Sequence, residues 1–467
     1  MDRITAGQLA EAAKGRILCG NPEVLVKHIQ IDSHAVGEGD LFVPLIGARI
    51  DAHQFIEQAI ASGAAAVLTS RHDRAESDRV WIRVEDTREA LQNIGRWFRS
   101  RLSLPLIGVT GSVGKTTTRE MIAAALSARY RVYKTPGNKN SQVGVPITIS
   151  EISKEDEIGV IELGVSEPGE MRRIAGIARV NQAVMTNIGV AHIGQFGTQE
   201  HIFQEKVQIQ ADMAPGGILF VNGDDLILQK AAAGEGCRRI LYGIGENCDY
   251  QAVDLQKEEG FPVFTAVDKA RGEKVRVKLS VLGEHMVGNA MVALAVAREN
   301  GIPMEEAAAA LEQFHGLPGR QQIYRGRDMV IVDDSYNASP VSMKAGIGVL
   351  CDLPAKGQRI AVLADMKELG ENEVCYHREI GEFLAGQPVD RVVLLGELAA
   401  EIGKAMEEKE LAAGGEGKRP VYFREKEALA DWLAQEIHAG DVVLFKGSNS
   451  MGLSSVVRRF LPDVLQQ

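Results

Sequence analysis

The sequence predicts an α/β protein of three domains. Its 467 residues exceed what one ordinary hydrophobic core can hold, and domains of about 100–200 residues imply about three of them. Short continuous apolar runs alternate with helical patterns along most of the chain, which is typical of mainly parallel sheets covered by helices on both faces. The pattern of these apolar runs and of the helical segments between them changes near residues 85 and 315. We therefore predict domains at residues 1–85, 86–315 and 316–467.

The first domain is predicted to be a small α/β unit. Its apolar runs are Asp40–Leu45, Ala64–Thr69 and Val80–Val84, and each has the length of a short strand. Between the first two lies a helical segment from Phe55 to Ser62, which Gly63 closes.

The second domain opens with an amphipathic helix, Thr87–Leu102, and then alternates strands with helices. Its four apolar runs are Leu106–Val109, Ile158–Ile161, Ala183–Met185 and Ile218–Val221. Runs that are apolar throughout predict strands buried on both faces, and therefore a mainly parallel sheet.

The third domain begins after Leu317–Arg320, whose Pro-Gly pair predicts a hinge. Ser339 and Pro340 have the residue types of a helix N-cap and first helical position. The pattern indicates a Rossmann-like domain without the G-x-G-x-x-G signature of a dinucleotide site. Its strand-like runs are Met329–Val332, Ile360–Leu363, Val392–Leu395 and Val442–Phe445.

Composition narrows the class of function. A net charge of −11 disfavours nucleic-acid binding, because the chain would repel a phosphate backbone. No segment reaches the roughly 18 uninterrupted apolar residues of a membrane span, and the residues after Met1 do not suggest a secretory signal. Five scattered cysteines form no C-x-x-C pair, which argues against a zinc ribbon or a disulfide scaffold. We expect a cytoplasmic protein that binds neither nucleic acid nor membrane.

A phosphate-binding loop is predicted at Thr110–Gly114, between a strand at Pro105–Val109 and a helix at Lys115–Arg129. Glycines let the backbone N–H groups wrap a phosphate, and the helix N-terminus adds positive potential. The lysine can neutralise the β- and γ-phosphates and the next hydroxyl can face Mg²⁺. The predicted nucleotide contacts are Gly111, Ser112, Val113, Gly114, Lys115, Thr116 and Thr117.

Two observations concern how well this loop matches known phosphate-binding patterns. Val109 occupies the first glycine position of the strict G-x-x-x-x-G-K-[ST] pattern. The loop also resembles that of protein-targeting GTPases, but the Asn/Thr-Lys-x-Asp motif that reads guanine is missing. We therefore expect a central P-loop ATPase domain rather than a GTPase.

Three residues downstream are candidates for binding a cation. Glu162 ends a buried strand at the same edge of the sheet as the loop, although it could equally be a solvated strand-end glutamate. His192 follows the Ala183–Met185 strand, and a lone histidine is more often structural than a ligand. Lys206 lies in a helical stretch from His201 to Met213, and its residue type alone indicates a surface lysine.

Taken together, these motifs resemble the Mur ligase family of peptidoglycan precursor synthesis over nearly the whole chain. Several motifs in order are more specific than any one of them. They are Thr110–Thr116, Gly137–Asn140, Gly144–Pro146, Glu162–Gly164, Thr186–Gly189, His192, Lys206, Asn222–Asp225, His285, Asn289, Gly319–Arg320, Asp333–Pro340, Asp365–Gly370, His377 and Lys446–Ser448.

The resemblance implies an ATP-dependent ligase with an N-terminal domain for a UDP-sugar, a central ATPase and a C-terminal domain for the incoming amine. The expected reaction joins D-alanyl-D-alanine to UDP-N-acetylmuramoyl-tripeptide through an acyl phosphate, with release of ADP and phosphate. A monomer is expected.

The resemblance also implies roles for single residues. Thr116 and Glu162 would hold one Mg²⁺, and His192 a second together with Lys206 as its carbamate. The expected catalytic residues are Lys115, Lys206, His192 and Arg320. Further nucleotide contacts are expected from Asn138, Asn289 at the adenine, Asp334 at the ribose and Arg320 at the phosphates, and substrate contacts from Ser33, Gly47 and Asn337.

The chain departs from the family pattern at a few positions. His34 and Asn449 stand where arginine is usual or frequent, and Ser141 and Ser339 replace commoner asparagines. His34 weakens the expected contact to the UDP-sugar.

Alternatives remain at this level. The ligase that adds diaminopimelate carries an Asp-Asn-Pro-Arg motif that this chain lacks, and folylpolyglutamate synthetase fits the N-terminal domain poorly. A nucleotide-hydrolysing switch is a rival from another class. The sequence leaves open the third residue of the tripeptide, the degree of domain closure and the base for the amine, for which His377 is conceivable but more typical of a surface histidine.

Overall fold

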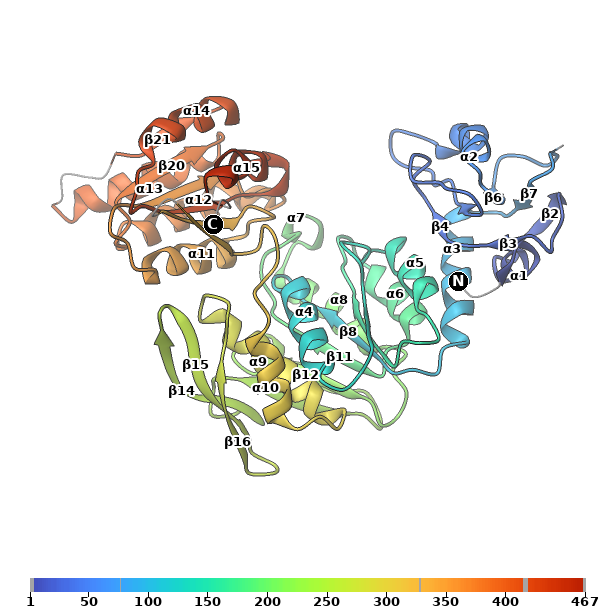
Figure 1. Cartoon of the computed structure of the whole chain (residues 1–467), viewed down its shortest axis with the longest axis horizontal. Helices are drawn as coiled ribbons and strands as arrows, with labels where there is room; N and C mark the ends of the chain where they lie inside the picture. The colour runs from blue at the N-terminus through green and yellow to red at the C-terminus, as the bar shows by residue number, and fades with distance from the viewer. Residues whose placement is uncertain (1–3, 76, 327–328, 415–418, 465–467) are drawn as a thin grey trace.

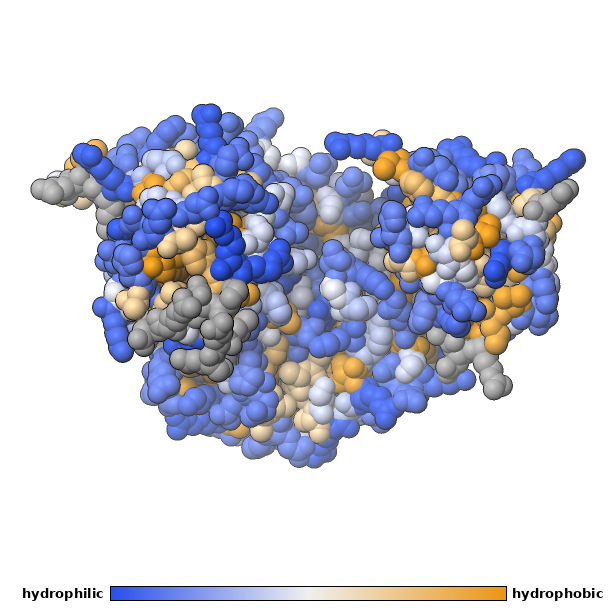
Figure 2. Space-filling model, turned by 45° about the horizontal axis from the view of Figure 1, so that its top comes forward, coloured by the Kyte–Doolittle hydropathy of each residue, from blue (hydrophilic) through white to orange (hydrophobic). Residues whose placement is uncertain are grey.

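The computed structural model describes residues 4–75, 77–326, 329–414 and 419–464. They form three lobes, each built on its own main sheet, with the first and third lobes on opposite sides of the central one (Figure 1). The predicted α/β class with three domains is confirmed. On the face shown in Figure 2 hydrophilic residues predominate, and the outline is notched between the two outer lobes.

The N-terminal lobe holds a five-stranded sheet in the order β2-β7-β6-β5-β4, parallel except for the β2–β7 pair. A second, two-stranded sheet pairs β1 with β3. The elements are β1 (Ile4–Thr5), α1 (Ala6–Ala12), β2 (Arg16–Cys19), β3 (Leu25–Val26), β4 (Ile29–Gln30), β5 (Leu41–Phe42), η1 (Ala52–Phe55), α2 (Ile56–Ala61), β6 (Ala66–Thr69) and β7 (Val80–Arg83).

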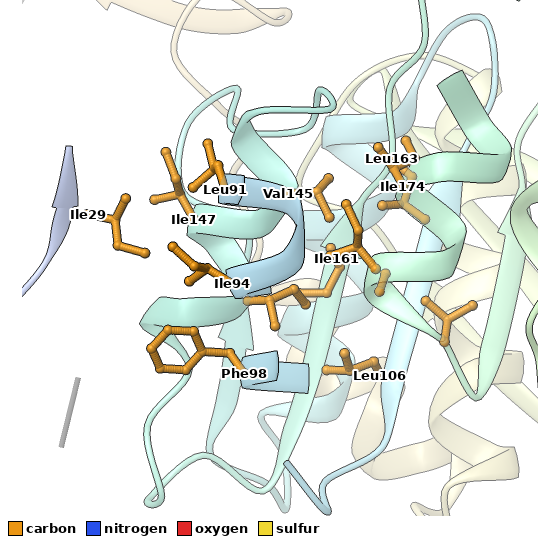
Figure 3. Packing of buried hydrophobic residues seen from close by; sticks show 14 of the residues in the cluster. Ile29, Leu91, Ile94, Phe98, Leu106, Val145, Ile147, Ile161, Leu163 and Ile174 are labelled. Atoms are coloured by element: carbon orange, nitrogen blue, oxygen red, sulfur yellow. The ribbon is translucent and has the colours of Figure 1, made fainter. Parts of the chain in front are cut away.

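Helix α3 (Thr87–Ser100) connects this lobe to the central domain. The Asp86 side chain caps it by accepting the Glu89 backbone N–H at 2.8 Å. Figure 3 shows its side chains packed against α5 (Gly144–Glu151) and β10 (Ile158–Glu162) of the central domain. At Gly95 an added Cβ would lie 2.8 Å from the Pro146 Cα, so α3 and α5 approach too closely for any side chain there.

The central sheet has nine strands in the order β16-β15-β14-β13-β12-β11-β8-β10-β9. All pairs from β9 to β14 are parallel, as predicted. The parallel strands, apart from β10, are β8 (Leu106–Thr110), β9 (Val132–Lys134), β11 (Gln182–Met185), β12 (Ile218–Asn222) and β13 (Arg238–Gly243).

An antiparallel extension of this sheet was not predicted. It consists of β14 (Tyr250–Glu258), β15 (Phe261–Asp268) and β16 (Glu273–Lys278). Strands β14 and β16 contain exposed residues and several charges, so they lack the continuous apolar runs that indicate buried parallel strands. Strand β15 between them is largely buried.

Helices cover both faces of the central sheet. Helix α4 (Lys115–Leu126), α9 (His285–Glu299) and α10 (Met304–Glu312) pack on one face. Helices α3, α5 and α6 (Glu170–Ala178) pack on the other. The carboxyl ends of β8, β10 and β11 therefore meet at one edge, where the predicted phosphate loop follows β8.

The C-terminal domain has six strands in the order β17-β18-β22-β19-β20-β21, with only β17 antiparallel. Helices cover both faces, as expected of a Rossmann-like unit. The strands are β17 (Gln322–Gly326), β18 (Met329–Asp334), β19 (Arg359–Ala364), β20 (Arg391–Leu395), β21 (Val421–Phe423) and β22 (Val442–Lys446). The helices are α11 (Pro340–Asp352), α12 (Glu373–Leu384), α13 (Ala399–Ala412), α14 (Lys426–Glu436) and α15 (Leu453–Val464).

The predicted start of α11 is confirmed, since the Ser339 hydroxyl accepts the Ser342 backbone N–H and Pro340 is the first helical residue. In the described part of the chain, no helix combines the length and apolar character needed to cross a membrane.

Candidate active site

A cavity of about 790 Å³ lies between the central and C-terminal domains, at the carboxyl ends of strands from both sheets. This volume is in the range of small-molecule sites. Most of the residues predicted from the sequence line it: Ser112, Val113, Gly114, Lys115, Thr116, Thr117, Asn138, Glu162, His192, Asn289, Arg320, Asp334 and Asn337. Gly111, Lys206, Ser33 and Gly47 are not among its lining residues.

The phosphate loop follows β8 and ends at Gly114, which has φ 84° and precedes α4. At Gly111, with φ 152°, an added Cβ would lie 1.9 Å from the Thr186 Oγ1, so only glycine fits there. Asn187 binds the loop from the next strand end: its carbonyl accepts the Ser112 N–H at 2.9 Å, and its Oδ1 accepts the Val113 N–H at 2.9 Å. Thr186 and Asn187 thus set the shape of the loop, a role that the sequence analysis missed.

Two buried hydroxyl groups and a lysine amine lie in or beside this loop. Among the described residues, the buried hydroxyls of Thr110 and Ser112 have no hydrogen-bond partner. The Lys115 Nζ folds back and donates to the Gly111 carbonyl at 2.8 Å. Burial lowers the pKa of Lys115, Glu162 opposes this shift, and Arg320 adds to it. Because buried polar groups are normally hydrogen-bonded, these donors fit an anionic group such as a nucleotide phosphate.

Glu162 lies at the end of β10 with only 2% of its surface exposed. Its Oε1 accepts the Asn140 Nδ2–H at 2.7 Å and its Oε2 accepts an Arg119 N–H at 3.2 Å. The alternative of a solvated strand-end glutamate is therefore wrong. Arg119, 4% exposed, also pairs with Glu120 at 2.6 Å and donates to the Gly137 carbonyl at 3.1 Å.

The role of Arg119 was also missed by the sequence analysis. It is four residues after Lys115 on α4 and therefore on the same helix face. That spacing was the available signal, although an arginine in a helix is usually exposed.

Lys206 ends α8 (Gln199–Lys206) and is 2% exposed, so its interpretation as a surface lysine is wrong. No hydrogen bond or ion pair to its amine occurs among the residues that the structure describes. Burial lowers the pKa of Lys206 well below its usual value, and the nearby charge of Lys115 lowers it further. The amine is thereby biased towards its neutral, nucleophilic form.

His192 precedes the short helix α7 (Ile193–Phe196) in a left-handed conformation, φ 61°. Its Nδ1 lies 2.9 Å from the Oε2 of Glu368, which belongs to the C-terminal domain. Burial lowers the pKa of His192; Glu368 opposes this shift, and Lys115 and Lys206 reinforce it. The ring is therefore biased towards its neutral form, which is the form that can bind a metal.

The C-terminal domain supplies charged groups to the opposite wall. The Arg320 guanidinium stacks over the Tyr336 ring, 4.0 Å from its centroid. Asp334 pairs with Lys446 at 2.5 Å, and the Lys446 amine also donates to the Asn337 carbonyl at 3.2 Å. Burial raises the pKa of Asp334, and the attraction of Lys446 opposes that rise.

Asn289 lies on α9 at another part of the cavity. Its Oδ1 accepts the Thr118 hydroxyl at 3.0 Å, which orients the amide. Tyr242, Ile244 and Met286 line the cavity with it. Apolar walls beside a fixed amide suit a flat heterocyclic base.

The predicted nucleotide contact Asn138 and the predicted substrate contacts do not all lie at the cavity. Asn138 and Asn337 are exposed at the cavity, whereas Ser33 and Gly47 lie in the N-terminal lobe. Ser33 is buried there, and the Gly47 N–H donates to the Ile50 carbonyl at 2.9 Å. In this arrangement the structure does not bring the N-terminal pair to the nucleotide cavity.

His377 is neither a base nor a surface residue. Its side chain is fully buried, its Nε2 accepts the Met366 N–H at 2.9 Å, and its Nδ1 lies 2.6 Å from the Glu373 carbonyl. Both ring nitrogens are used to hold backbone, so the side chain has a structural role.

Three α/β domains with a phosphate loop in the second, opposed by charged residues of the third, define a nucleotide-dependent enzyme whose site is shared between domains. The chain belongs to the Mur ligase family. The Mur ligase middle domain matches residues 109–297, the glutamate ligase domain matches 319–449, and the model described as the family's catalytic domain matches 25–99. Family members are ATP-dependent enzymes that form amide bonds.

Individual members of the family resemble the chain over nearly its whole length. The chain is 35% identical to the UDP-N-acetylmuramoyl-tripeptide–D-alanyl-D-alanine ligase of Bacillus subtilis, over the whole of both chains. A crystal structure of MurF from Acinetobacter baumannii has a TM-score of 0.87 at 30% identity and covers 98% of each chain. MurF from Thermotoga maritima, solved in complex with ADP, has a TM-score of 0.81 at 31% identity, with 95% of this chain and 99% of that one covered.

Proposed function

We propose that this chain is an ATP-dependent ligase that joins D-alanyl-D-alanine to UDP-N-acetylmuramoyl-tripeptide and so completes the pentapeptide precursor of the cell wall. The observation that carries the proposal is the shared cavity, in which the phosphate loop of one domain faces Arg320 and Asp334 of another. The named relatives, matched over their full length, support the choice of substrates.

The chemistry requires an activated carboxylate, because a free carboxylate is a poor acyl donor. Its oxygen attacks the γ-phosphorus of ATP and ADP leaves, which gives an acyl phosphate. The amine of D-alanyl-D-alanine then attacks the carbonyl carbon, phosphate leaves with the C–O bond electrons, and the amine proton passes to solvent or a base. Lys115 and Arg320 would neutralise charge on the transferred phosphoryl group, and alignment of the reactants contributes several kcal/mol, about 7–11 in the best cases.

The residues at the cavity fit two Mg²⁺ ions. Thr116 and Glu162 would hold one ion, and His192 with Lys206 the other. No group of three or more histidine, cysteine, aspartate or glutamate side chains is placed to hold a metal among the described residues; nucleotide phosphates and water would complete the coordination of Mg²⁺, and a further oxygen ligand could come from Lys206. The Lys206 amine, biased towards its neutral form, would supply one by reacting with CO₂ to give a carbamate and a proton. When bound, the ions would neutralise phosphate charge.

The UDP-sugar would bind the N-terminal lobe near Ser33 and Gly47, and the amine substrate near Asn337. Movement of the domains would then bring the tripeptide carboxylate to the nucleotide and exclude water from the acyl phosphate. We further propose that the protein works as a monomer, because one chain supplies both walls of the cavity. A cytoplasmic setting fits its five free cysteines.

The test is ATP-dependent phosphate release with the tripeptide substrate and D-alanyl-D-alanine, each alone and then together. Tripeptides ending in diaminopimelate and in lysine are both supplied. We expect sustained release only when both substrates are present, with the pentapeptide found by mass spectrometry. Release that is independent of either acceptor would instead identify a nucleotide-hydrolysing switch.

A further inference from the structure

A contact between the central and C-terminal domains involves His192, one of the proposed cation ligands. The Nδ1 of His192 in the central domain lies 2.9 Å from the Oε2 of Glu368 in the C-terminal domain. A carboxylate at this distance favours a proton on Nδ1, which leaves the lone pair of Nε2 free. A histidine that donates one ring N–H to a carboxylate is oriented to bind a metal through its other nitrogen.

The segment that carries Glu368 is firmly held by its own domain. The Met366 N–H donates to the buried His377 ring at 2.9 Å, and the Lys367 N–H donates to the Ser448 hydroxyl at 2.9 Å. The Asp365 carboxylate accepts the Ala399 N–H at 2.7 Å. The position of Glu368 therefore follows that of the C-terminal domain as a body.

The two domains also meet through backbone beside this contact. An added Cβ at Gly370 would lie 3.0 Å from the Gly194 Cα, and one at Gly194 would lie 3.3 Å from the Gly370 Cα. His192 and Glu368 both have left-handed backbones, with φ 61° and 65°. Non-glycine residues adopt this conformation at a cost that surrounding structure must offset, and here the two such residues face each other across the domain contact.

We propose that Glu368 is a positioning residue that orients His192 for the cation and thereby couples the cation site to the position of the C-terminal domain. This inference rests on the proposed function, because it takes His192 as a cation ligand. The Glu368 side chain is 68% exposed, and exposed ion pairs contribute little to stability. Its effect is therefore expected in the orientation of the ring rather than in holding the domains together.

The experiment measures cation binding directly. Mn²⁺ is titrated into the full-length protein saturated with a non-hydrolysable ATP analogue, and free Mn²⁺ is followed by electron paramagnetic resonance. Glu368→Ala should weaken Mn²⁺ binding by about 10- to 100-fold, the usual effect of removing a carboxylate behind a ligating histidine. Glu368→Gln keeps an oxygen that accepts the Nδ1–H bond and should lose less.

Two further variants make the result specific. Glu371→Ala removes an exposed glutamate of the same segment that does not line the cavity, and its Mn²⁺ affinity should equal that of the unaltered protein. In a His192→Ala background, Glu368→Ala should have no additional effect, because it acts through the ring. Unchanged Mn²⁺ affinity in Glu368→Ala, or an equal further loss in the His192→Ala background, would overturn the inference.

The outcomes separate this inference from the proposed function. An unaltered protein that fails to ligate, but whose Mn²⁺ affinity falls in Glu368→Ala, would refute the ligase and support the role of Glu368. An unaltered protein that binds no Mn²⁺ beyond that of the free nucleotide would overturn the role of Glu368, whatever its activity with the two acceptors.

Discussion

At the scale of single residues, buried ion pairs hold side chains of the site in place. Arg119 sits between Glu162 and Glu120, and all three are buried. Burying an ion costs several kcal/mol unless its partners compensate, so each member depends on the others. The same arginine binds the Gly137 carbonyl beside Asn138, which links the orientation of Glu162 to a loop that lines the cavity.

Replacing Arg119 should therefore be costly. Arg119→Ala leaves the buried Glu162 without its ion-pair partner and Glu120 with Lys134 as its remaining one, and we expect a loss of about 3–5 kcal/mol in the free energy of unfolding. Urea denaturation measures it. The matched control is Arg129→Ala, which breaks the exposed pair with Glu306 and should change the free energy by less than about 1 kcal/mol. Equal effects of the two substitutions would contradict this account.

Lys206 offers a second prediction at this scale. If its carbamate supplies an oxygen ligand, Lys206→Ala should lose ligation and recover part of it when a small carboxylate such as formate or propionate is added. Rates of pentapeptide formation with and without the carboxylate provide the measurement. Lys230→Ala, which removes an exposed lysine paired with Glu200, should retain activity and show no response to the additive. Undiminished turnover in Lys206→Ala would exclude a role in cation binding.

At the scale of elements, α3 attaches the N-terminal lobe to the central domain. The helix belongs to the connection between two sheets, yet its apolar face packs on α5 and α6 of the central domain. Arg99 adds hydrogen bonds from α3 to the Ala178 and Arg179 carbonyls at 2.7 and 3.0 Å. The helix is thus bound to the central domain by both packing and polar contacts.

This packing can be tested at Ile94, which is fully buried on α3. Ile94→Ala removes a large apolar group and leaves a cavity, so we expect a loss of about 2–5 kcal/mol in the free energy of unfolding. The control, Arg88→Ala, alters an exposed position of the same helix and should stay within about 0.5 kcal/mol. Thermal and urea unfolding of both variants decide the point, and a small effect at Ile94 would mean that α3 packs loosely.

At the scale of the whole molecule, continuous apolar runs were sufficient to predict the α/β class and the parallel strands. The β14–β16 extension was missed because two of its strands, β14 and β16, are partly exposed and charged, a pattern that local sequence shares with loops and helices. Residue type misled at Lys206 and His377. The residue type of a lysine or histidine does not indicate whether its side chain is buried, because burial depends on segments that lie far apart in the chain.

The candidate site could likewise be predicted only in part. The phosphate loop could be predicted because all of its parts are contiguous in sequence. Arg119, and the role of Asn187 in holding the loop, were missed because their partners come from other strands and helices.

The buried packing around α3 has a consequence for how the protein unfolds. Apolar residues of the N-terminal lobe and of one face of the central sheet form one continuous cluster through this helix. The apolar clusters of the C-terminal domain take in few residues from outside it: Leu282, with Val190 and Phe261 packed beside it. Because cooperative units follow shared cores, the first two lobes should melt together and the third by itself. A calorimetric scan would then show two transitions for a chain with three sheets.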